Sequence, residues 1–324
     1  MLRIGENQMI LRELKIGNIT VSVPIIQGGM AVRISTARLA AAVANEGGIG
    51  IIAGTGMSMD ELINEIRMAR KMTNGVIGVN VLFAVREFAD LVRTAMKEGI
   101  DLFISGAGFS RDMFSWGKEY DTPIIPIVSS AKLASMAEKL GAAAVVVEGK
   151  EAGGHLGTDR PMKEILREVC KEVKIPVIAA GGIIDGKDIA GAIKLGASGV
   201  QMGTRFAASE ESAASKEMKD MYVRANKEDV VHISSPVGLP GQCIRNGFYK
   251  RIESGASKGT HECFACLKRC NHNFCIMKAL LNACDRGNPE EALMFAGELV
   301  YKIKEILPVK QIFKNLLSEL AGAE

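Results

Sequence analysis

The sequence predicts an α/β protein of the (β/α)8 barrel, or TIM barrel, class, followed by a mainly helical extension. The first observation is a series of short apolar segments, rich in Val and Ile, that alternate with stretches of helical pattern. Strands of a parallel sheet have this composition because both of their faces are buried. The second observation is that there are eight such segments, spaced by roughly 20–30 residues, as eight β/α units require. A doubly wound open sheet is the rival, but it rarely needs eight regular units.

The first four strands are predicted from apolar runs that end in glycine or a small polar residue. Glycine at these ends suits a tight turn into the following helix, because it has no Cβ. An Ala-rich stretch at residues 35–44 and a second stretch that ends near Met72 are predicted as helices. In chain order, the four strands cover residues 23–31, 47–56, 75–83 and 101–105.

The last four strands follow the same pattern and complete the barrel. Between them, residues 131–140 and 187–195 are predicted as helices from the spacing of their apolar side chains. The four strands cover residues 123–130, 144–147, 175–183 and 197–206. We therefore predict a barrel domain over residues 1–206 and an extension over residues 207–324.

The loop after the sixth predicted strand is the strongest candidate for a catalytic site. The apolar run ends in Glu148, and the glycine-containing loop that follows carries His155, one of only four histidines in the chain. In α/β barrels the loops at the carboxyl ends of the strands carry the chemistry. Gly153 and Gly154 let the backbone approach a flat ligand closely. The alternative is a plain turn with a histidine on the surface, because loop histidines are common.

Composition and charge exclude several classes of protein. The hydrophobic content of 48% and the charged content of 24% are typical of a soluble globular enzyme. The net charge is only +3, without a basic stripe, so we expect no nucleic-acid partner. No apolar run is long enough to span a membrane, and the first residues do not resemble a signal peptide. We therefore expect a cytoplasmic protein, in which its seven cysteines are thiols or metal ligands rather than disulfides.

A phosphate site is predicted at the loops after the seventh and eighth strands, where TIM barrels often hold a phosphate. The backbone N–H groups of Gly181, Gly182, Gly203 and Thr204 could converge there, together with the Thr204 hydroxyl. The alternative is that these glycines only form tight turns. Two such loops in succession favour a cofactor that carries a phosphate.

The motifs together resemble one enzyme family. VPIIQGGMA, GVNV, EGKEAGGHLG, PVIAAGGIIDG and GVQMGTRF are similar to the nitronate monooxygenases, formerly called 2-nitropropane dioxygenases, and to the related FMN-dependent enoyl-ACP reductases. The similarity extends from residue 23 to residue 206 and is weaker beyond. It implies a TIM barrel, a flavoprotein with FMN and no separate dinucleotide-binding domain, and a histidine beside the flavin.

The resemblance also implies roles for individual residues. His155 matches the catalytic histidine of the family, and Glu148 stands where many relatives have Gln. The implied cofactor-binding residues are Gly29, Met30, Ala31, Asn80, Glu148, Gly153, Gly182, Gln201, Met202, Gly203 and Thr204, to which the phosphate argument adds Gly181.

Two oxidoreductase activities remain open, and the flavin motifs do not separate them. In the first, a nitronate monooxygenase, His155 removes the α-proton of a nitroalkane or holds its nitro oxygens, and oxygen completes the reaction. In the second, an enoyl-ACP or enoyl-CoA reductase, NAD(P)H supplies hydride, and His155 steadies the thioester carbonyl or supplies a proton. A flavin-binding or metal-binding protein without turnover is a third hypothesis, which requires His155 to be idle. We expect the nitronate monooxygenase, acting on a small molecule, and leave the oligomeric state open, with a homodimer among the alternatives.

The extension is predicted to be mainly helical. Residues 210–227, 290–307 and 309–320 have helical patterns, and residues 234–242 are predicted as a Pro/Gly loop. This loop either borders the substrate mouth or is a surface loop. Its SPVGLPG stretch resembles relatives described as monooxygenases and favours that branch.

A Cys-rich segment at residues 261–284 is the unusual feature of the extension. Four soft ligands within thirteen residues can converge on one metal, so we predict an iron–sulfur cluster, or zinc if His261 and His272 take part. A reduced segment without metal is the alternative. The four predicted ligands are Cys263, Cys266, Cys270 and Cys275.

Overall fold

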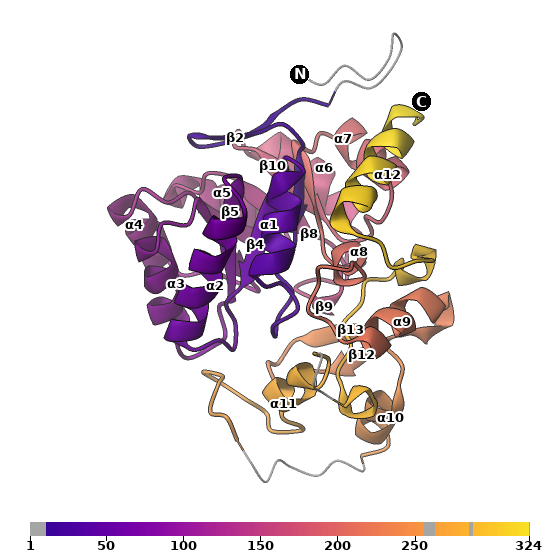
Figure 1. The fold of residues 1–324 in the computed structure, drawn as a ribbon. Coiled ribbons are helices and arrows are strands. Elements are labelled where there is room, and N and C mark those ends of the chain that lie inside the picture. The colour runs from indigo at the N-terminus through magenta and orange to yellow at the C-terminus, as the bar shows by residue number, and fades with distance from the viewer. Residues whose placement is uncertain (1–10, 256–262, 285–287, 324) are drawn as a thin grey trace.

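A computed structural model describes residues 11–255, 263–284 and 288–323 of the 324-residue chain. Eight parallel strands close into a barrel in the order β10-β11-β3-β4-β5-β6-β7-β8, as the sequence predicted. Helices surround the barrel, the last helix of the chain among them, and the rest of the C-terminal part lies at one end of the barrel (Figure 1). The strands are β3 (Ile25–Gln27), β4 (Ile49–Ala53), β5 (Val76–Leu82), β6 (Leu102–Gly106), β7 (Ile124–Val128), β8 (Val145–Glu148), β10 (Val177–Ala180) and β11 (Gly199–Met202).

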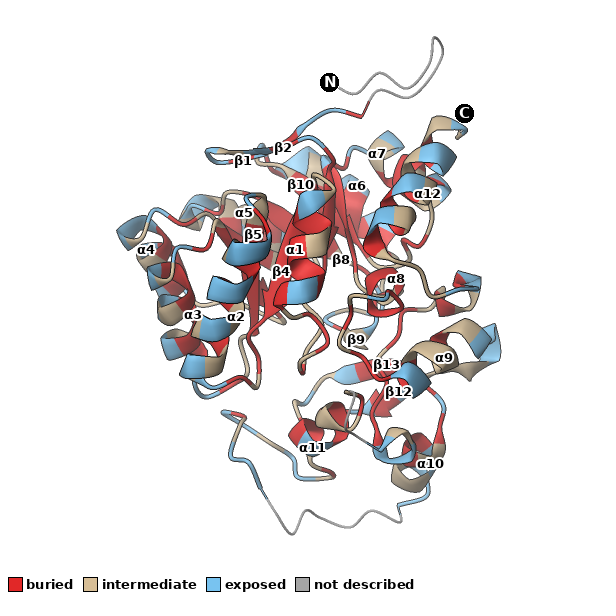
Figure 2. Ribbon diagram, viewed as in Figure 1, coloured by how far each residue is buried: buried red, intermediate tan, exposed pale blue. Residues whose placement is uncertain are grey.

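Helices connect the successive strands, and each places its apolar face on the barrel. Figure 2 shows the buried strands at the centre, and the helices expose mainly their outer faces. The helix α2 begins at Ser58, whose side chain accepts a hydrogen bond from the backbone N–H of Glu61, a standard N-cap. The helices are α1 (Ala37–Asn45), α2 (Met59–Met72), α3 (Phe88–Lys97), α4 (Asp112–Glu119), α5 (Ala131–Leu140), α6 (Met162–Glu172), α7 (Gly186–Lys194) and the short α8 (Thr204–Ala207).

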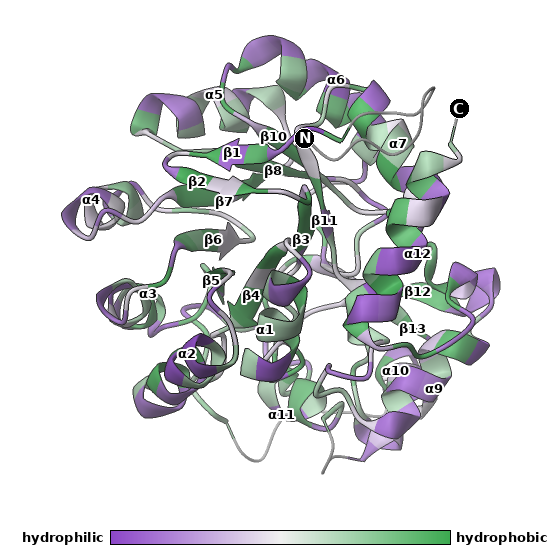
Figure 3. Cartoon of the chain, turned by 45° about the horizontal axis from the view of Figure 1, so that its top comes forward, coloured by the Kyte–Doolittle hydropathy of each residue, from purple (hydrophilic) through white to green (hydrophobic). Residues whose placement is uncertain are grey.

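The barrel strands alternate between two cores, because successive side chains of a strand point to opposite faces. Ile49, Ile51 and Ile104 belong to a core inside the barrel, whereas Ile52 and Phe103 pack toward the helices. The hairpin β1 (Leu14–Ile16) and β2 (Ile19–Val21) adds Leu14 and Ile16 to the inner core. The hairpin is a separate sheet that covers this core with its apolar side chains, and the sequence did not predict it. Hydrophobic residues accordingly follow the strands in Figure 3.

The C-terminal part differs from the predicted set of helices. The predicted Pro/Gly loop at residues 234–242 is in fact the turn of a hairpin between β12 (Val230–Ser234) and β13 (Pro240–Ile244). The strand β13 also pairs with β9 (Gly154–His155), so that the His155 loop of the barrel shares a three-stranded sheet with the extension. The loop prediction is therefore right for residues 235–239 but missed the two flanking strands, because a Pro/Gly-rich stretch carries no local signal for pairing between distant segments.

The predicted helix at residues 290–307 was also wrong. The structure has two short 3-10 helices there, Pro289–Glu291 and Val300–Lys302. Between them, Phe295 forms an isolated bridge with Cys243, and the N–H of Ala296 donates to the carbonyl of Gln242. Pairing with β13 thus replaces the helix. The other helices of this part are α9 (Lys216–Arg224), α10 (Gly247–Glu253), α11 (Ile276–Leu281) and α12 (Val309–Ala321).

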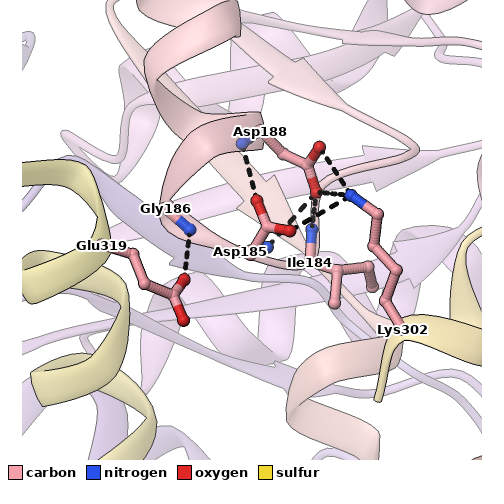
Figure 4. Close-up of polar contacts among 6 residues, drawn as sticks. All are labelled: Ile184, Asp185, Gly186, Asp188, Lys302 and Glu319. Atoms are coloured by element: carbon pink, nitrogen blue, oxygen red, sulfur yellow. Dashed lines mark hydrogen bonds and ion pairs between the residues drawn. The ribbon is translucent and has the colours of Figure 1, made fainter. Parts of the chain in front are cut away.

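The predicted helix at residues 309–320 is confirmed by α12. The predicted helix at residues 210–227 is shorter in the structure, because α9 begins at Lys216, directly after its N-cap residue Ser215. The helix α12 docks on α7 through polar contacts at the α7 N-terminus (Figure 4). Asp185 and Asp188 form a capping box there, and the Glu319 carboxylate accepts from the N–H of Gly186 at 2.8 Å. Lys302 bridges both aspartates at 3.1 and 3.0 Å. These contacts tie the end of the chain to the barrel.

No helix in the described part of the chain is both long and apolar enough to cross a membrane. The division of the chain at residue 206 stays a prediction.

Candidate active site

A cavity of about 230 Å³ lies at the carboxyl ends of the barrel strands. Loops that follow the strands line one side of it, and the C-terminal part lines the other. We call it the barrel-mouth cavity. All predicted flavin-site residues lie in its wall, namely Gly29, Met30, Ala31, Asn80, Glu148, Gly153, His155, Gly181, Gly182, Gln201, Met202, Gly203 and Thr204.

Glycines let the backbone pass close to the cavity on the β3 side. A Cβ on Gly29 would lie 2.4 Å from the Cβ of Asn80, a distance that real side chains do not tolerate. Asn80 cannot easily move away, because it is buried and its amide donates to the carbonyl of Ile104 at 3.1 Å. The backbone at Gly29 is therefore packed directly on the Asn80 side chain.

The loop after β10 turns under the cavity with two residues in the left-handed region. Gly181 has φ +96° and Gly182 has φ +67°, which favour glycine. A Cβ on Gly181 would lie 3.0 Å from the backbone nitrogen of Ala152, which precedes Gly153 in the His155 loop. The loops after β8 and β10 are thus in close contact, as the predicted cofactor site requires.

The end of β11 carries polar groups that suit a ligand. Gln201 is buried, and its Oε1 has no hydrogen-bond partner among the described residues. A buried acceptor of this kind is costly unless a ligand or water satisfies it. The Thr204 hydroxyl accepts from the N–H of Gly297 at 2.9 Å, which brings the C-terminal part against the predicted phosphate loop.

His155 stands in β9, at the edge between the barrel and the extension. Its Nε2 lies 2.7 Å from the Oγ of Ser235, and its ring packs edge-on against Phe295 at 5.0 Å. The Tyr222 hydroxyl in turn donates to the carbonyl of Phe295. Burial lowers the pKa of His155 to about 4, so the imidazole is neutral at physiological pH. A neutral ring can accept or donate one hydrogen bond at each nitrogen.

Glu148 ends β8 in the wall of the same cavity. Desolvation raises the pKa of its enclosed carboxyl group to about 7. The carboxyl group is therefore largely neutral below this pH and can donate a hydrogen bond.

We expect Glu148→Gln to remove a pH dependence of stability. In the wild type the folded-state pKa of about 7 lies above the usual 4.5, so the free energy of unfolding falls as pH rises from about 4.5 to 7 and then levels off. Glutamine does not titrate, so this pH dependence is absent from the variant. The free energy of unfolding of the variant, relative to that of the wild type, should therefore rise by on the order of 2–3 kcal/mol from pH 5 to pH 8. Urea unfolding at both pH values measures this. Glu172→Gln, at an exposed position of α6, is the control, and equal pH profiles for all three proteins would disprove the role of burial.

Sequence reasoning missed the apolar wall on the side of the extension. The SPVGLPG turn does border the cavity through Val237. The other side chains come from the Cys-rich segment and from the predicted helix at residues 290–307, and only the tertiary fold brings them to this cavity. They are Leu267, Ile276, Met277, Leu280, Leu293 and Phe295.

The four predicted metal ligands are not arranged as a metal site. No group of three or more His, Cys, Asp or Glu side chains among the described residues could hold a metal ion, and His261 lies outside these residues. Burial raises the pKa of Cys266, and the nearby Cys275, Cys270 and Cys263 add to this effect, so the thiols are neighbours without being a ligand set. The structure thus gives no support to the predicted iron–sulfur or zinc centre.

The Cys-rich segment is instead held by hydrogen bonds to the barrel. The backbone N–H of Arg86 donates to the carbonyl of Cys266, and the N–H of Lys268 donates to the carbonyl of Ala84. The Lys268 ammonium group also lies 4.0 Å from the centre of the Phe83 ring. These contacts hold the segment on the barrel without a metal ligand set among the described residues.

Comparisons with known proteins agree with this geometry. A family model described as nitronate monooxygenase matches residues 12–319. A "(3aS,4S,5R,7aS)-5-hydroxy-7a-methyl-1-oxo-octahydro-1H-indene-4-carboxyl-CoA dehydrogenase" of Mycobacterium tuberculosis is 34% identical over 72% of this chain, which spans about two thirds (66%) of that protein. A probable nitronate monooxygenase of Staphylococcus aureus is 29% identical, over 72% of this chain and 78% of that protein.

Solved structures show the same fold along nearly the whole chain. FabK from Thermotoga maritima is 35% identical with a TM-score of 0.82, covering 93% of each chain. A nitroalkane oxidase from Streptomyces ansochromogenes is 24% identical with a TM-score of 0.79, covering 93% of this chain and 96% of that one, and supports the fold alone.

Proposed function

Because the chain belongs to the nitronate monooxygenase family, we propose that this flavin-type oxidoreductase uses FMN and binds its substrate beside His155. The barrel-mouth cavity supports the choice of FMN. Its wall has the unsatisfied Gln201 oxygen and the glycine loops at residues 181–182 and 203, and the sequence has no GxGxxG fingerprint for a dinucleotide. FMN, when bound, supplies the exchange of hydride or electrons with the substrate.

Different residues would hold different parts of such a cofactor. Gln201 and Asn80 would offer amide groups to a flavin ring, and the missing Cβ of Gly29 lets the backbone there pack directly on Asn80, which keeps that amide in the cavity wall. The backbone N–H groups at residues 181–182 and 203–204 would hold the phosphate, with the Thr204 hydroxyl. Glu148 would offer its neutral carboxyl group as a donor below pH 7.

We infer that the substrate is an enoyl thioester, which is reduced with electrons from NAD(P)H. The observation that carries this is the apolar wall that the extension adds to the cavity, formed by Ile276, Met277, Leu280 and Leu293. Such a wall suits an acyl chain, because each buried methylene contributes about 0.8 kcal/mol to binding. The relative in Mycobacterium tuberculosis is named as a carboxyl-CoA dehydrogenase, which supports a CoA thioester as the broader substrate class.

Nitronate oxidation, the activity expected from the motifs, is the second candidate. The family model and the relatives in Staphylococcus aureus favour it. A neutral His155 is also suited to accept the α-proton of a nitroalkane. A small nitroalkane, however, would leave the apolar wall unused.

Parallel assays test the substrate class. One follows NAD(P)H oxidation with straight-chain trans-2-enoyl-CoA thioesters of four, six and eight carbons, and the other follows oxygen uptake with propyl-2-nitronate. We expect enoyl-dependent oxidation, with kcat/KM rising severalfold as the chain lengthens, because each added methylene is buried. Nitronate-dependent oxygen uptake without enoyl-dependent turnover would reject the thioester in favour of the second candidate.

A further inference from the structure

We propose that Ser235 is a positioning residue for His155. The Ser235 hydroxyl donates a hydrogen bond to Nε2 of His155 and so fixes the neutral ring with its proton on Nδ1. The inference rests on the proposed function, because it gives His155 a hydrogen-bond donor to offer a substrate carbonyl. The two residues lie 80 positions apart in sequence, and no motif joins them.

The contact between the two side chains is short and buried. Oγ of Ser235 lies 2.7 Å from Nε2 of His155, and Ser235 is only 1% exposed. The backbone reinforces the contact, because β9 pairs with β13 with His155 opposite Gly241. Leu156 adds a hydrogen bond from its N–H to the carbonyl of Pro240. The imidazole therefore meets Ser235 in a fixed register.

The direction of the hydrogen bond follows from the partners of the hydroxyl group. Oγ already accepts from the N–H of Val237 at 3.3 Å, within the turn that connects β12 and β13. A serine hydroxyl has one proton to donate. Among the described residues, the acceptor within hydrogen-bond distance of this hydroxyl group is Nε2 of His155. A buried O–H without an acceptor would be costly, so we infer that it donates to Nε2.

The tautomer of the ring is a consequence of this direction. When Nε2 accepts, its lone pair is occupied, and a neutral imidazole must then carry its proton on Nδ1. A ring in this state offers an N–H donor rather than a base at its other nitrogen. It can hold a thioester carbonyl oxygen as charge builds up there, which is the role that the reductase needs.

The Cys-rich segment fixes the position of Ser235 from the outside. The side-chain amide of Asn271 donates to the carbonyl of Ser235 at 3.2 Å, and that of Asn273 donates to the carbonyl of Ser234 at 2.8 Å. Within the turn, the N–H of Gly238 donates to the carbonyl of Ser235 at 3.0 Å. The Cys-rich segment thus supports the turn that carries Ser235 and orients His155.

The direct test is the tautomer of His155 in the flavin-loaded protein. Long-range ¹H–¹⁵N NMR of protein labelled at histidine distinguishes the two tautomers, and with only four histidines in the chain the His155→Gln variant assigns the signal. We expect the proton on Nδ1. A proton on Nε2 would overturn the proposal.

Three variants separate positioning from general stability. Ser235→Ala should keep its flavin but lose the fixed tautomer, and kcat for enoyl-CoA reduction should fall about tenfold with little change in KM, because one oriented hydrogen bond is lost. Ser235→Thr keeps a hydroxyl and should retain the tautomer and most of the activity. Ser234→Ala, at the exposed neighbouring position, should behave as the wild type.

Flavin content and thermal unfolding are measured for each variant, so that a folding defect is recognised. If Ser235→Ala does not fold, the proposal is tested by the tautomer and the activity of Ser235→Thr. A Ser235→Ala protein with an unchanged tautomer and unchanged kcat would contradict the proposal. The tautomer needs no substrate for its measurement. An inactive protein in the enoyl-CoA assay with the expected tautomer would therefore count against the proposed function and support the positioning.

Discussion

Replacement of His155 by alanine is expected to lower kcat by roughly 10²–10⁴-fold while the flavin stays bound. The ring lies in the cavity wall and is held by Ser235 and Phe295, whereas the groups that suit the cofactor phosphate are on the loops after β10 and β11. Under the proposed function, removal of the ring therefore takes away the group assigned to the substrate and leaves the loops assigned to the phosphate intact. Steady-state kinetics and the flavin absorbance of the purified variant measure the two effects.

His232→Ala is the matched control for this experiment. His232 is an exposed histidine of β12 whose Nε2 contacts Oε1 of Gln242 at 2.9 Å, and it is absent from the cavity wall. We expect its replacement to leave kcat within about twofold of wild type, as for most surface substitutions. Loss of flavin from the His155 variant would make His155 a cofactor ligand, and full activity would show that it has no catalytic part.

Replacement of Gly29 by alanine is expected to weaken flavin binding by roughly 10- to 100-fold, the range of 1–3 kcal/mol that overpacking usually costs. The new Cβ would lie 2.4 Å from Asn80, so either the backbone at residue 29 or the Asn80 side chain must move. Both line the cavity, and Asn80 is held by its hydrogen bond to Ile104. Titration of the apoprotein with flavin, followed by fluorescence, gives the change in Kd.

Gly191→Ala provides the comparison, because a Cβ at this position of α7 would meet open space. It should bind flavin as the wild type does and gain up to about 1 kcal/mol in stability from helix propensity. If Gly29→Ala has the same Kd as the wild type while its circular dichroism shows a folded protein, the flavin does not use this side of the cavity.

The sequence predicted the barrel because each strand has a local signal. Runs such as residues 144–147 are apolar, rich in β-branched side chains and stopped by glycine, and the structure confirms all eight. The barrel side of the cavity wall was also predictable, because parallel strands bring their carboxyl ends to one edge, and Gly29, Gly182 and Gln201 all line the cavity there. The resemblance to a family, and not the strand pattern, identified the individual cofactor-binding residues in this wall.

The remaining features depend on contacts between distant segments. The pairing of β9 with β13 joins residues 154–155 to residues 241–242, and nothing in either stretch alone specifies it. Residues 290–307 have a helical pattern, but pairing of Phe295 and Ala296 with β13 overrides this propensity. The close spacing of the cysteines suggested a metal, whereas the surrounding hydrogen bonds hold their segment.

The central claim is that an FMN-dependent oxidoreductase site occupies the mouth of this barrel. Mass spectrometry of the flavin released from freshly purified protein, with the stoichiometry from absorbance, tests it most directly. The account predicts FMN at about one molecule per chain, because we propose one phosphate site at the loops after β10 and β11 and the sequence has no GxGxxG fingerprint. FAD, or no flavin in protein that also fails to bind added FMN, would contradict it.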